Sequence, residues 1–344
     1  MKPLSAKDIG SMDRHAIQRR RTLLAFCAGA LAPPTSLAPL PSFAQPPASM
    51  PTVGILGTNA EGRLAGLRAG LLALGYVEGR NLRLLERSGG ERYERVAEVI
   101  NEFMRLKVNV IVTIGTTAAQ AAAKATSTIP IVMTSGADPV KAGLAASLAR
   151  PGGNLTGMSQ FLQELTAKRM QLAIEAFPGA HQVGVLWNPN SPASTAALAE
   201  AKAAAKALNL RLHLVEARAA ADIDKALDTL RKARVDIAMP LSSNMLVDNR
   251  KLLLASANKY RLTTVCDSLE WGEAGALIAY GVNQRELYFH LATHIDKILK
   301  GAKPGDLPIE QPTTFDFVVN LKTAKALGIK VPQTILLQAT RVIE

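Results

Sequence analysis

The chain has 344 residues, of which 48% are hydrophobic, 20% are charged and only 4% are aromatic. This length suits two domains rather than one, and the charged fraction is that of a globular protein, which excludes wholesale disorder. Forty basic residues against 28 acidic ones give a net charge of +12, but the basic residues beyond the N-terminus are scattered. Because aromatic side chains are also scarce, we expect no nucleic-acid partner.

The N-terminus has the pattern of an export signal. Three arginines at 19–21 precede the hydrophobic run 22–32, which is too short to span a bilayer of about 30 Å. Residues 42–44, Ser-Phe-Ala, fit a small-x-small cleavage site. We therefore predict that residues 1–44 are a cleaved export signal and that 45–50 are a flexible linker, which places the mature protein in the periplasm.

The route of export and the start of the chain stay open at this point. The arginines fit either a secretory signal or a twin-arginine-like signal, and both Met1 and Met12 precede a normal basic region. Cys27 lies inside the signal, which leaves Cys266 alone and excludes an intrachain disulfide in the mature form. Since no later stretch is apolar enough to cross a bilayer, we expect a mature form without a membrane span. We also expect that form to be a monomer.

Beyond residue 50, short β-rich runs alternate with longer helical stretches. Strands are predicted at 53–59, 82–87, 108–115, 129–135 and 155–159. Helices are predicted between them at 63–74, 93–106, 116–126 and 140–149. Continuous apolar runs separated by helices are typical of a buried parallel sheet.

The same series recurs in the second half of the chain. Runs at 183–190, 210–216, 235–242, 262–268 and 277–281 match the first five in order. Five matches at near-constant spacing predict an α/β fold of two similar, doubly wound parallel-sheet lobes joined by a hinge. The first lobe is expected to comprise 51–157 plus 282–310, and the second 158–281 plus 311–344.

Two such lobes would hold a ligand between them. In doubly wound sheets ligands bind beyond the carboxyl ends of the strands, and facing lobes would bring two such edges to one cleft. A clamp of this kind closes on a small solute by hinge motion. Together with the export signal, this architecture predicts a periplasmic receptor for a small-molecule ligand.

Two long runs of sequence are specific enough to suggest a family: PGGNLTG at 151–157 and DLPIEQPTTFDFVVNLKTAKALG at 306–328. With the segments 66–82, 129–159, 298–336 and 342–344, they resemble the ABC-transporter substrate-binding family related to the tryptophan and tyrosine receptors. The resemblance implies a type I periplasmic-binding-protein fold with three crossing strands. It also implies delivery of the ligand to an ABC permease in the inner membrane, driven by an ATPase.

The chain departs from this family in two stretches. Residues 241–244 read Leu-Ser-Ser-Asn and residues 275–281 read Gly-Ala-Leu-Ile-Ala-Tyr-Gly, where relatives often carry other motifs. Both stretches lie near the expected mouth of the second lobe. The resemblance therefore supports the fold more firmly than the identity of the ligand.

Polar side chains follow the first and third strands of the first lobe. Thr58 and Asn59 come after the first strand and suit either a hydrogen bond to a ligand or the cap of the next helix. Thr116 and Thr117 open the Ala-rich helix after the third strand. The N-terminus of that helix has free N–H groups and a partial positive charge, which suit a carboxylate even if Thr116 also caps the helix.

Ser135 and Asp138 follow the fourth strand of the first lobe. Asp138 before Pro139 is also a helix-start signature, which by itself accounts for the aspartate. In the functional interpretation, Ser135 or Asp138 reaches the ligand, and Asp138 faces an ammonium group. An acidic group near a helix N-terminus suits a zwitterion such as an amino acid.

Four residues are candidates in the second lobe. Trp187 follows the first strand of that lobe, where its ring suits either an apolar wall for a ligand or burial between sheet and helix. Asp267 ends the fourth strand and is expected to contact a polar ligand. Tyr280 and Asn283 lie at the expected return crossing and are similar candidates.

Motifs of catalysis are missing from the sequence. His290 and His294 have the spacing of zinc ligands, but the segment lacks the glutamate of His-Glu-x-x-His, so both are expected to be solvated. The chain has no Gly-x-Ser-x-Gly elbow, and residues 54–57 lack the spacing of a dinucleotide fingerprint. Cys266 is expected to be buried and inert. We predict no enzyme activity, no metal and no cofactor.

The leading hypothesis is thus a receptor that captures an amino acid or related carboxylate and delivers it to an ABC importer. One alternative is a periplasmic sensing subunit that docks on a signalling receptor. A further alternative is an exported α/β enzyme, which the missing motifs disfavour.

Overall fold

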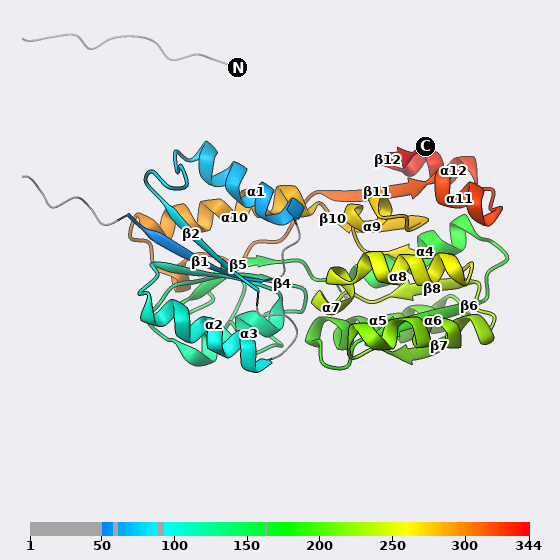
Figure 1. Ribbon diagram of the computed structural model, residues 1–344, viewed down its shortest axis with the longest axis horizontal. Coiled ribbons are helices and arrows are strands. Elements are labelled where there is room, and N and C mark those ends of the chain that lie inside the picture. The colour runs from blue at the N-terminus through cyan, green and yellow to red at the C-terminus, as the bar shows by residue number, and fades with distance from the viewer. Residues whose placement is uncertain (1–49, 58–60, 89–92, 163) are drawn as a thin grey trace, which may run out of the picture. The chain divides into compact units, whose positions relative to one another are not determined.

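The computed structural model describes residues 50–57, 61–88, 93–162 and 164–344 (Figure 1). The predicted export signal lies outside the described residues, and so do Thr58 and Asn59. The other eight predicted site residues all lie in the described part of the chain.

Five strands form one parallel sheet, which together with its helices is called the first lobe here. The strands are β1 (Thr52–Leu56), β2 (Arg83–Arg87), β3 (Val110–Ile114), β4 (Ile131–Ser135) and β5 (Leu155–Ser159). Their order is β2-β1-β3-β4-β5, and every neighbouring pair is parallel. All strands except the edge strand β2 are buried along their length, as expected for a parallel sheet covered on both faces.

Helices cover both faces of this sheet. They are α1 (Glu61–Ala73), α2 (Tyr93–Arg105), α3 (Thr116–Ala125) and α10 (Gln284–Leu299). One apolar cluster joins α1 and α10 to the sheet, and another joins α2 and α3 to its opposite face. Gly66 and Gly70 bring α1 close to α10, because a Cβ atom at either position would lie 2.3 Å from the carbonyl oxygen of Arg285 or Phe289.

Seven strands build the second lobe. They are β6 (Gln182–Trp187), β7 (Arg211–Glu216), β8 (Ile237–Pro240), β9 (Val265–Cys266), β10 (Ile278–Val282), β11 (Phe315–Asn320) and β12 (Arg341–Ile343). They form one sheet of order β7-β6-β8 and another of order β12-β11-β10-β9. A bridge between Ala238 and Thr264 connects β8 to the segment before β9, so the two sheets continue one another.

Helices also cover both faces of the second lobe. They are α4 (Glu164–Ala176), α5 (Pro192–Ala207), α6 (Ile223–Lys232), α7 (Asn244–Asp248), α8 (Arg250–Lys259), α9 (Leu269–Glu273), α11 (Leu321–Leu327) and α12 (Gln333–Gln338). Two short 3₁₀ helices cover Ala220–Asp222 and Pro304–Asp306. One apolar cluster packs α4 and α5 against the strands, and another packs α6, α7, α8 and α9.

The predicted duplication is confirmed by the strand order. The series β7-β6-β8-β9-β10 repeats β2-β1-β3-β4-β5 position by position. The second lobe differs in carrying two more strands: β11 pairs antiparallel to β10, and β12 pairs parallel to β11. The fold is thus the predicted pair of doubly wound α/β lobes, with two added strands, β11 and β12, that run antiparallel to β10 and that the repeat did not predict.

The helix predicted at 140–149 is wrong. Residues 139–143 form turns, and regular helix is absent from this described stretch. Gly143 has φ +72°, which ends the turn that begins at Asp138. The chain then bends so that the carbonyl oxygen of Leu148 accepts a 2.8 Å hydrogen bond from the backbone N–H of Ile309. A tertiary contact here outweighs the local helix propensity of an alanine-rich run.

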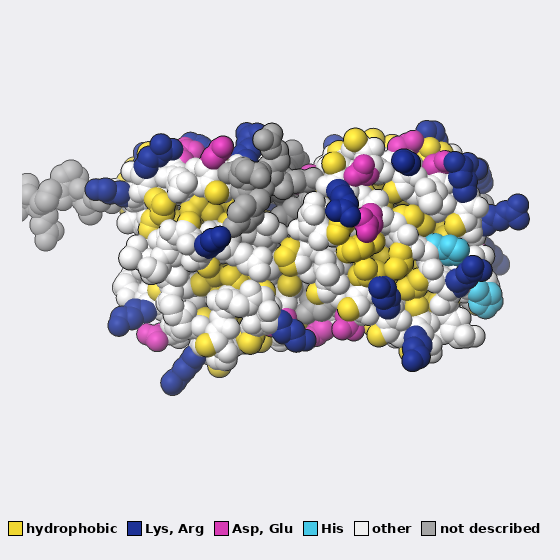
Figure 2. Space-filling view, turned by 90° about the horizontal axis from the view of Figure 1, so that it is seen from below, with side chains coloured by type: hydrophobic (Ala, Val, Ile, Leu, Met, Phe, Trp, Pro, Cys, Tyr) yellow, Lys and Arg dark blue, Asp and Glu magenta, His cyan; other side chains and the backbone are white. Residues whose placement is uncertain are grey.

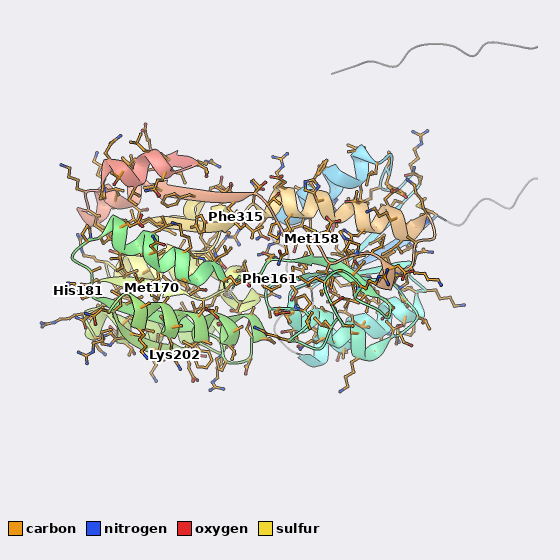
Figure 3. All side chains as sticks on the ribbon, turned by 180° about the vertical axis from the view of Figure 1, so that it is seen from behind. Met158, Phe161, Met170, His181, Lys202 and Phe315 are labelled. Carbon is orange, nitrogen blue, oxygen red and sulfur yellow. The ribbon has the colours of Figure 1, made fainter. Side chains whose placement is uncertain are left out.

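The chain passes between the lobes at three crossovers, as Figure 1 shows. The first follows β5, the second joins β10 to α10, and the third leads into β11. Phe161 lies in the first crossover and Phe315 at the end of the third, and both are in the region between the lobes in Figure 3. The crossovers bring residues far apart in the sequence to one place.

Charges of both signs are dispersed over the surface. On the face drawn in Figure 2, Lys and Arg side chains are spread over both lobes. Several pair with acidic neighbours, as Arg231 and Lys232 do with Asp228. In the described part of the chain, the helices are too short or too polar for any of them to cross a membrane.

Candidate functional site

A cavity lies between the lobes, where the carboxyl ends of their strands face each other. One residue just beyond each of six strands lines it. These residues are Gly57 after β1, Gly115 after β3, Gly136 after β4, Asn188 after β6, Ser242 after β8 and Asp267 after β9. The cavity therefore occupies the position at which doubly wound sheets bind their ligands.

The two walls of the cavity differ in chemistry. The first lobe contributes apolar side chains such as Leu56, Val96 and Ile114, whereas the second lobe contributes mainly hydroxyl and amide groups. The lining also includes charged groups of both signs from the two lobes. These are Arg63 on α1, Arg218 after β7 and Asp267. Arg218 is already paired with Glu216 at 2.5 Å, whereas Arg63 Nε and Asp267 Oδ1 have no hydrogen-bond partner among the described residues.

The first turn of α3 faces this cavity. Thr116, Thr117 and Ala118 all line it, and the residue before the helix is Gly115, which offers no side chain to cap the helix. The backbone N–H groups of a first helical turn have no partner within the helix. The N-terminus of α3 is thus suited to bind an anionic group. Because Gly115 is the N-cap, the alternative interpretation that Thr116 caps this helix is wrong.

Thr116 and Ser135 hold the adjacent loops together. Thr116 is only 4% exposed, and its hydroxyl lies 3.0 Å from that of Ser135 and accepts a 3.2 Å hydrogen bond from the N–H of Ala137. Ser135 in turn donates to the carbonyl oxygen of Ala137 at 2.8 Å. Ser135 is fully buried, so it supports the cavity wall from behind. Thr117, by contrast, is half-buried on the cavity surface.

Asp267 is a buried carboxylate that lines the cavity from the second lobe. The residue is 6% exposed, and its Oδ1 has no hydrogen-bond partner in the part of the chain that the structure describes. Gly281 packs directly on its backbone, because a Cβ atom there would lie 1.7 Å from the Asp267 carbonyl oxygen. A buried polar atom without a partner costs free energy, which a donor on a bound molecule would recover.

A buried arginine lies behind Asp267. Arg169 on α4 is 1% exposed, and burial lowers the pKa of its guanidinium while the carboxylate of Asp267 opposes that change. Its side chain donates to the carbonyl oxygens of Tyr280 at 3.0 Å and Leu162 at 3.1 Å. Arg169 therefore offsets the charge of Asp267 and binds two of the crossovers at once.

Of the eight described residues that were predicted, the structure brings Thr116, Thr117 and Asp267 together at this cavity. Asp138 lies instead at a separate pocket beside α5. There its Oδ1 accepts hydrogen bonds from the N–H groups of Val140 and Lys141, so it stabilises a turn rather than a helix start.

The other predicted residues have structural contacts. Trp187 packs on the apolar cluster of the second lobe, and Tyr280 stacks on Phe315 with ring centroids 6.2 Å apart. Asn283 caps α10 by accepting from the N–H of Glu286 and donates to Asp316 at 3.2 Å. None of these side chains lines the cavity in the described part of the chain.

Sequence reasoning missed several polar residues that line the cavity. Arg63 follows β1 on α1, Gln160 directly follows β5, and Gln284 opens α10 shortly after β10. Asn244 was noted only as a departure from the family, yet its Nδ2 donates to the carbonyl oxygen of Ile114 across the cleft at 3.1 Å. Gln160, Gln284 and Asn244 lie within four residues of a strand end, so a wider strand-end criterion would have selected them, whereas Arg63 lies seven residues beyond β1.

The expectation for the histidines is wrong in part. His290 is exposed, but His294 is only 1% exposed, and its Nε2 lies 3.2 Å from the carbonyl oxygen of Pro308. Burial lowers the pKa of His294 because the charged imidazolium loses its water. Cys266 is fully buried, as predicted.

Two facing α/β lobes with a cavity at their strand ends define the class of type I periplasmic binding proteins. The family described as ABC transporter substrate binding protein matches residues 56–343. The chain belongs to this family.

Individual relatives agree with this assignment. The chain is 27% identical over 256 residues to a tyrosine-binding protein of Clostridioides difficile (strain R20291), covering 74% of this chain and 73% of that protein. A conserved domain protein from Vibrio cholerae has a similar structure, with 27% identity, a TM-score of 0.80, and coverage of 85% of this chain and 99% of that one. An ABC domain from Streptococcus pneumonia in complex with L-Trp has 25% identity and a TM-score of 0.78, over 86% of this chain and 100% of that one.

Proposed function

We propose that this protein is the periplasmic receptor of an ABC importer and that it captures an α-amino acid in the cavity between its lobes. One observation carries the proposal: within the described residues, the unpartnered carboxylate oxygen of Asp267 and the uncapped first turn of α3 line the same cavity from opposite lobes. An α-amino acid carries the two complementary charges. Its ammonium would bind Asp267, and its carboxylate would bind the N–H groups of α3.

Arg63 supports the same orientation of the ligand. Its Nε is buried and has no hydrogen-bond partner among the described residues, and it lines the cavity from the first lobe, as α3 does. A guanidinium and a helix N-terminus on one side favour the carboxylate there. Asp267 on the other side favours the ammonium, so a zwitterion held this way touches both lobes.

The relatives support the ligand class. Among them are a protein described as tyrosine-binding and a structure in complex with L-Trp, and both ligands are α-amino acids. In this chain the described lining of the cavity contains no aromatic side chain, so the contacts to the shared α-amino and α-carboxylate groups are the firmer part of the proposal. Membership of the family and the predicted export signal support delivery of the ligand to an inner-membrane permease.

Calorimetric titration of the mature protein with the twenty proteinogenic L-amino acids tests this function. We expect at least one of them to bind, and Asp267→Asn to weaken that binding about tenfold or more, since loss of a buried charged hydrogen bond costs about 1.5–3 kcal/mol. Asp228→Asn is the matched control, because Asp228 pairs with Arg231 and Lys232 on the surface. If no amino acid binds, the proposed function is wrong.

A further inference from the structure

A pair of amide side chains joins two of the crossovers inside the cavity. Gln160 directly follows β5 in the first crossover, and Gln284 opens α10 after the second. The Nε2 of Gln284 donates to the Oε1 of Gln160 at 2.8 Å, although the two residues lie 124 positions apart in the chain. Both side chains line the cavity.

Gln284 has one acceptor that the described part of the protein leaves unused. The residue is 5% exposed, and its Oε1 has no hydrogen-bond partner among the described residues. Because Nε2 is engaged with Gln160, the amide is fixed in one orientation, and Oε1 remains to accept from another molecule. A buried acceptor beside a cavity indicates a ligand that carries a donor at this place.

A second side chain, that of Arg169, also links the regions of these two crossovers. Arg169 donates to Leu162 in the first crossover and to Tyr280 at the second. The guanidinium and the amide pair thus form two connections between the same segments, and of these two the amide pair lines the cavity. A ligand that contacts Gln284 therefore contacts the junction about which the lobes would move.

Resting on the proposed function, we propose that Gln284 is a specificity-determining residue that recognises the amino group of the ligand. Its Oε1 accepts one N–H of the ammonium, and Asp267 Oδ1 accepts another. Among the described residues that line the cavity, these are the two buried side-chain acceptors without a partner, and an ammonium has three N–H groups to share between them. A carboxylic acid without the amino group leaves both acceptors unsatisfied.

The test compares an amino acid with its deaminated acid in calorimetric titrations of the mature protein. The pair is the L-amino acid that binds wild type most tightly and the acid with hydrogen in place of its amino group, such as 3-(4-hydroxyphenyl)propionate for L-tyrosine. Gln284→Met keeps the length of the side chain but removes the acceptor. We expect this variant to lower the affinity for the amino acid about tenfold and the affinity for the deaminated acid by less than threefold or so.

Two further variants complete the design. Gln171→Met is the matched control, because Gln171 is exposed on α4 and donates to Glu175 one turn along the same helix, and it should change neither affinity. Gln284→Glu keeps an acceptor at the same place, so it should retain binding of the amino acid even if Gln284→Met fails to fold.

The outcomes separate this inference from the proposed function. If an amino acid binds the wild-type protein but Gln284→Met lowers the affinities for the amino acid and for the deaminated acid equally, Gln284 has only a structural role. The inference is then wrong, whereas the proposed function stands. The inference also falls if Gln284→Glu abolishes binding of the amino acid while remaining folded. If no amino acid binds the wild-type protein, both the proposed function and this inference are wrong.

Discussion

Gly115 and Asn244 meet across the cleft in a close contact. Gly115 has φ +97°, and a Cβ atom there would lie 2.6 Å from Nδ2 of Asn244, the atom that donates to the carbonyl oxygen of Ile114. The hydrogen bond joins the end of β3 in the first lobe to the start of α7 in the second. A Cβ atom at position 115 would therefore have to displace the amide of Asn244 from this hydrogen bond.

Gly115→Ala should therefore displace the Asn244 side chain and weaken this link between the two lobes. We expect a larger radius of gyration in small-angle scattering and a binding affinity for the amino acid that falls about tenfold or more. Gly301→Ala is the control, because Gly301 also has a positive φ of +99° and a Cβ atom there would meet no described atom within 4 Å, so it places alanine at a positive φ without the contact. Equal effects of the two variants would show that strain, rather than the contact with Asn244, is responsible.

Thr116→Val should mainly lower stability, whereas Thr117→Val should mainly lower binding affinity. Thr116 is buried and bonded to Ser135 and Ala137, so its loss should lower the free energy of unfolding by about 1–3 kcal/mol. Thr117 lines the cavity at its surface, so its loss should weaken amino-acid binding while leaving unfolding nearly unchanged. Denaturant titration and calorimetry measure the two effects. A Thr117→Val protein with wild-type affinity would exclude this hydroxyl from binding.

Cys266 should resist alkylation in the folded protein. Burial raises the pKa of its thiol well above the ordinary value, and the nearby carboxylate of Asp267 raises it further. Because the thiolate is the reactive species, iodoacetamide at about pH 8 should modify Cys266 only when the protein unfolds. Mass mapping of the peptide that contains Cys266, with and without denaturant, measures this. Rapid labelling of the native protein would contradict the burial of β9.

Tyr76 should make stability depend on pH in the alkaline range. Its hydroxyl donates to Asp296 at 3.0 Å, and burial together with this bond raises its pKa to about 12. The pKa of Tyr76 in the folded protein exceeds the value of about 10 in the unfolded chain. The contribution of the Tyr76 hydroxyl to the free energy of unfolding is therefore fully present below pH 10 and is lost as the pH rises towards 12.

Tyr76→Phe should accordingly lose less stability than wild type between about pH 9.5 and pH 11.5. Denaturant titrations at both values measure the difference. Lys300, which also binds Asp296, is present in both proteins and so affects both curves. Identical losses in the two proteins would show that Tyr76 does not titrate with a raised pKa.

Export should remove the N-terminal segment. Mass spectrometry of the protein from a periplasmic fraction should show a chain that starts near Gln45 and lacks Cys27. A retained and acylated Cys27 would show that the protein is a lipoprotein instead.

Much of the architecture was predictable from sequence because it depends on local pattern. Apolar runs of strand length, separated by helical stretches and repeated once, are sufficient to predict two doubly wound lobes. The rule that ligands bind beyond strand ends selected Thr116, Thr117 and Asp267, all of which line the cavity. Position along the chain decides these features, because a residue after a buried parallel strand necessarily emerges at one edge of the sheet.

Tertiary structure decided which side of that edge each residue faces and which distant segments meet. Ser135 supports the cavity wall from behind, and Trp187 packs on the core, although both are at strand ends. The run 140–149 is no helix because Leu148 bonds to Ile309, far along the chain. Gln160 and Gln284 form one hydrogen bond only because two crossovers lie side by side. The hydrophobic periodicity of a segment predicts its secondary structure. Contacts between two crossovers depend instead on tertiary packing, which the local periodicity of either segment does not predict.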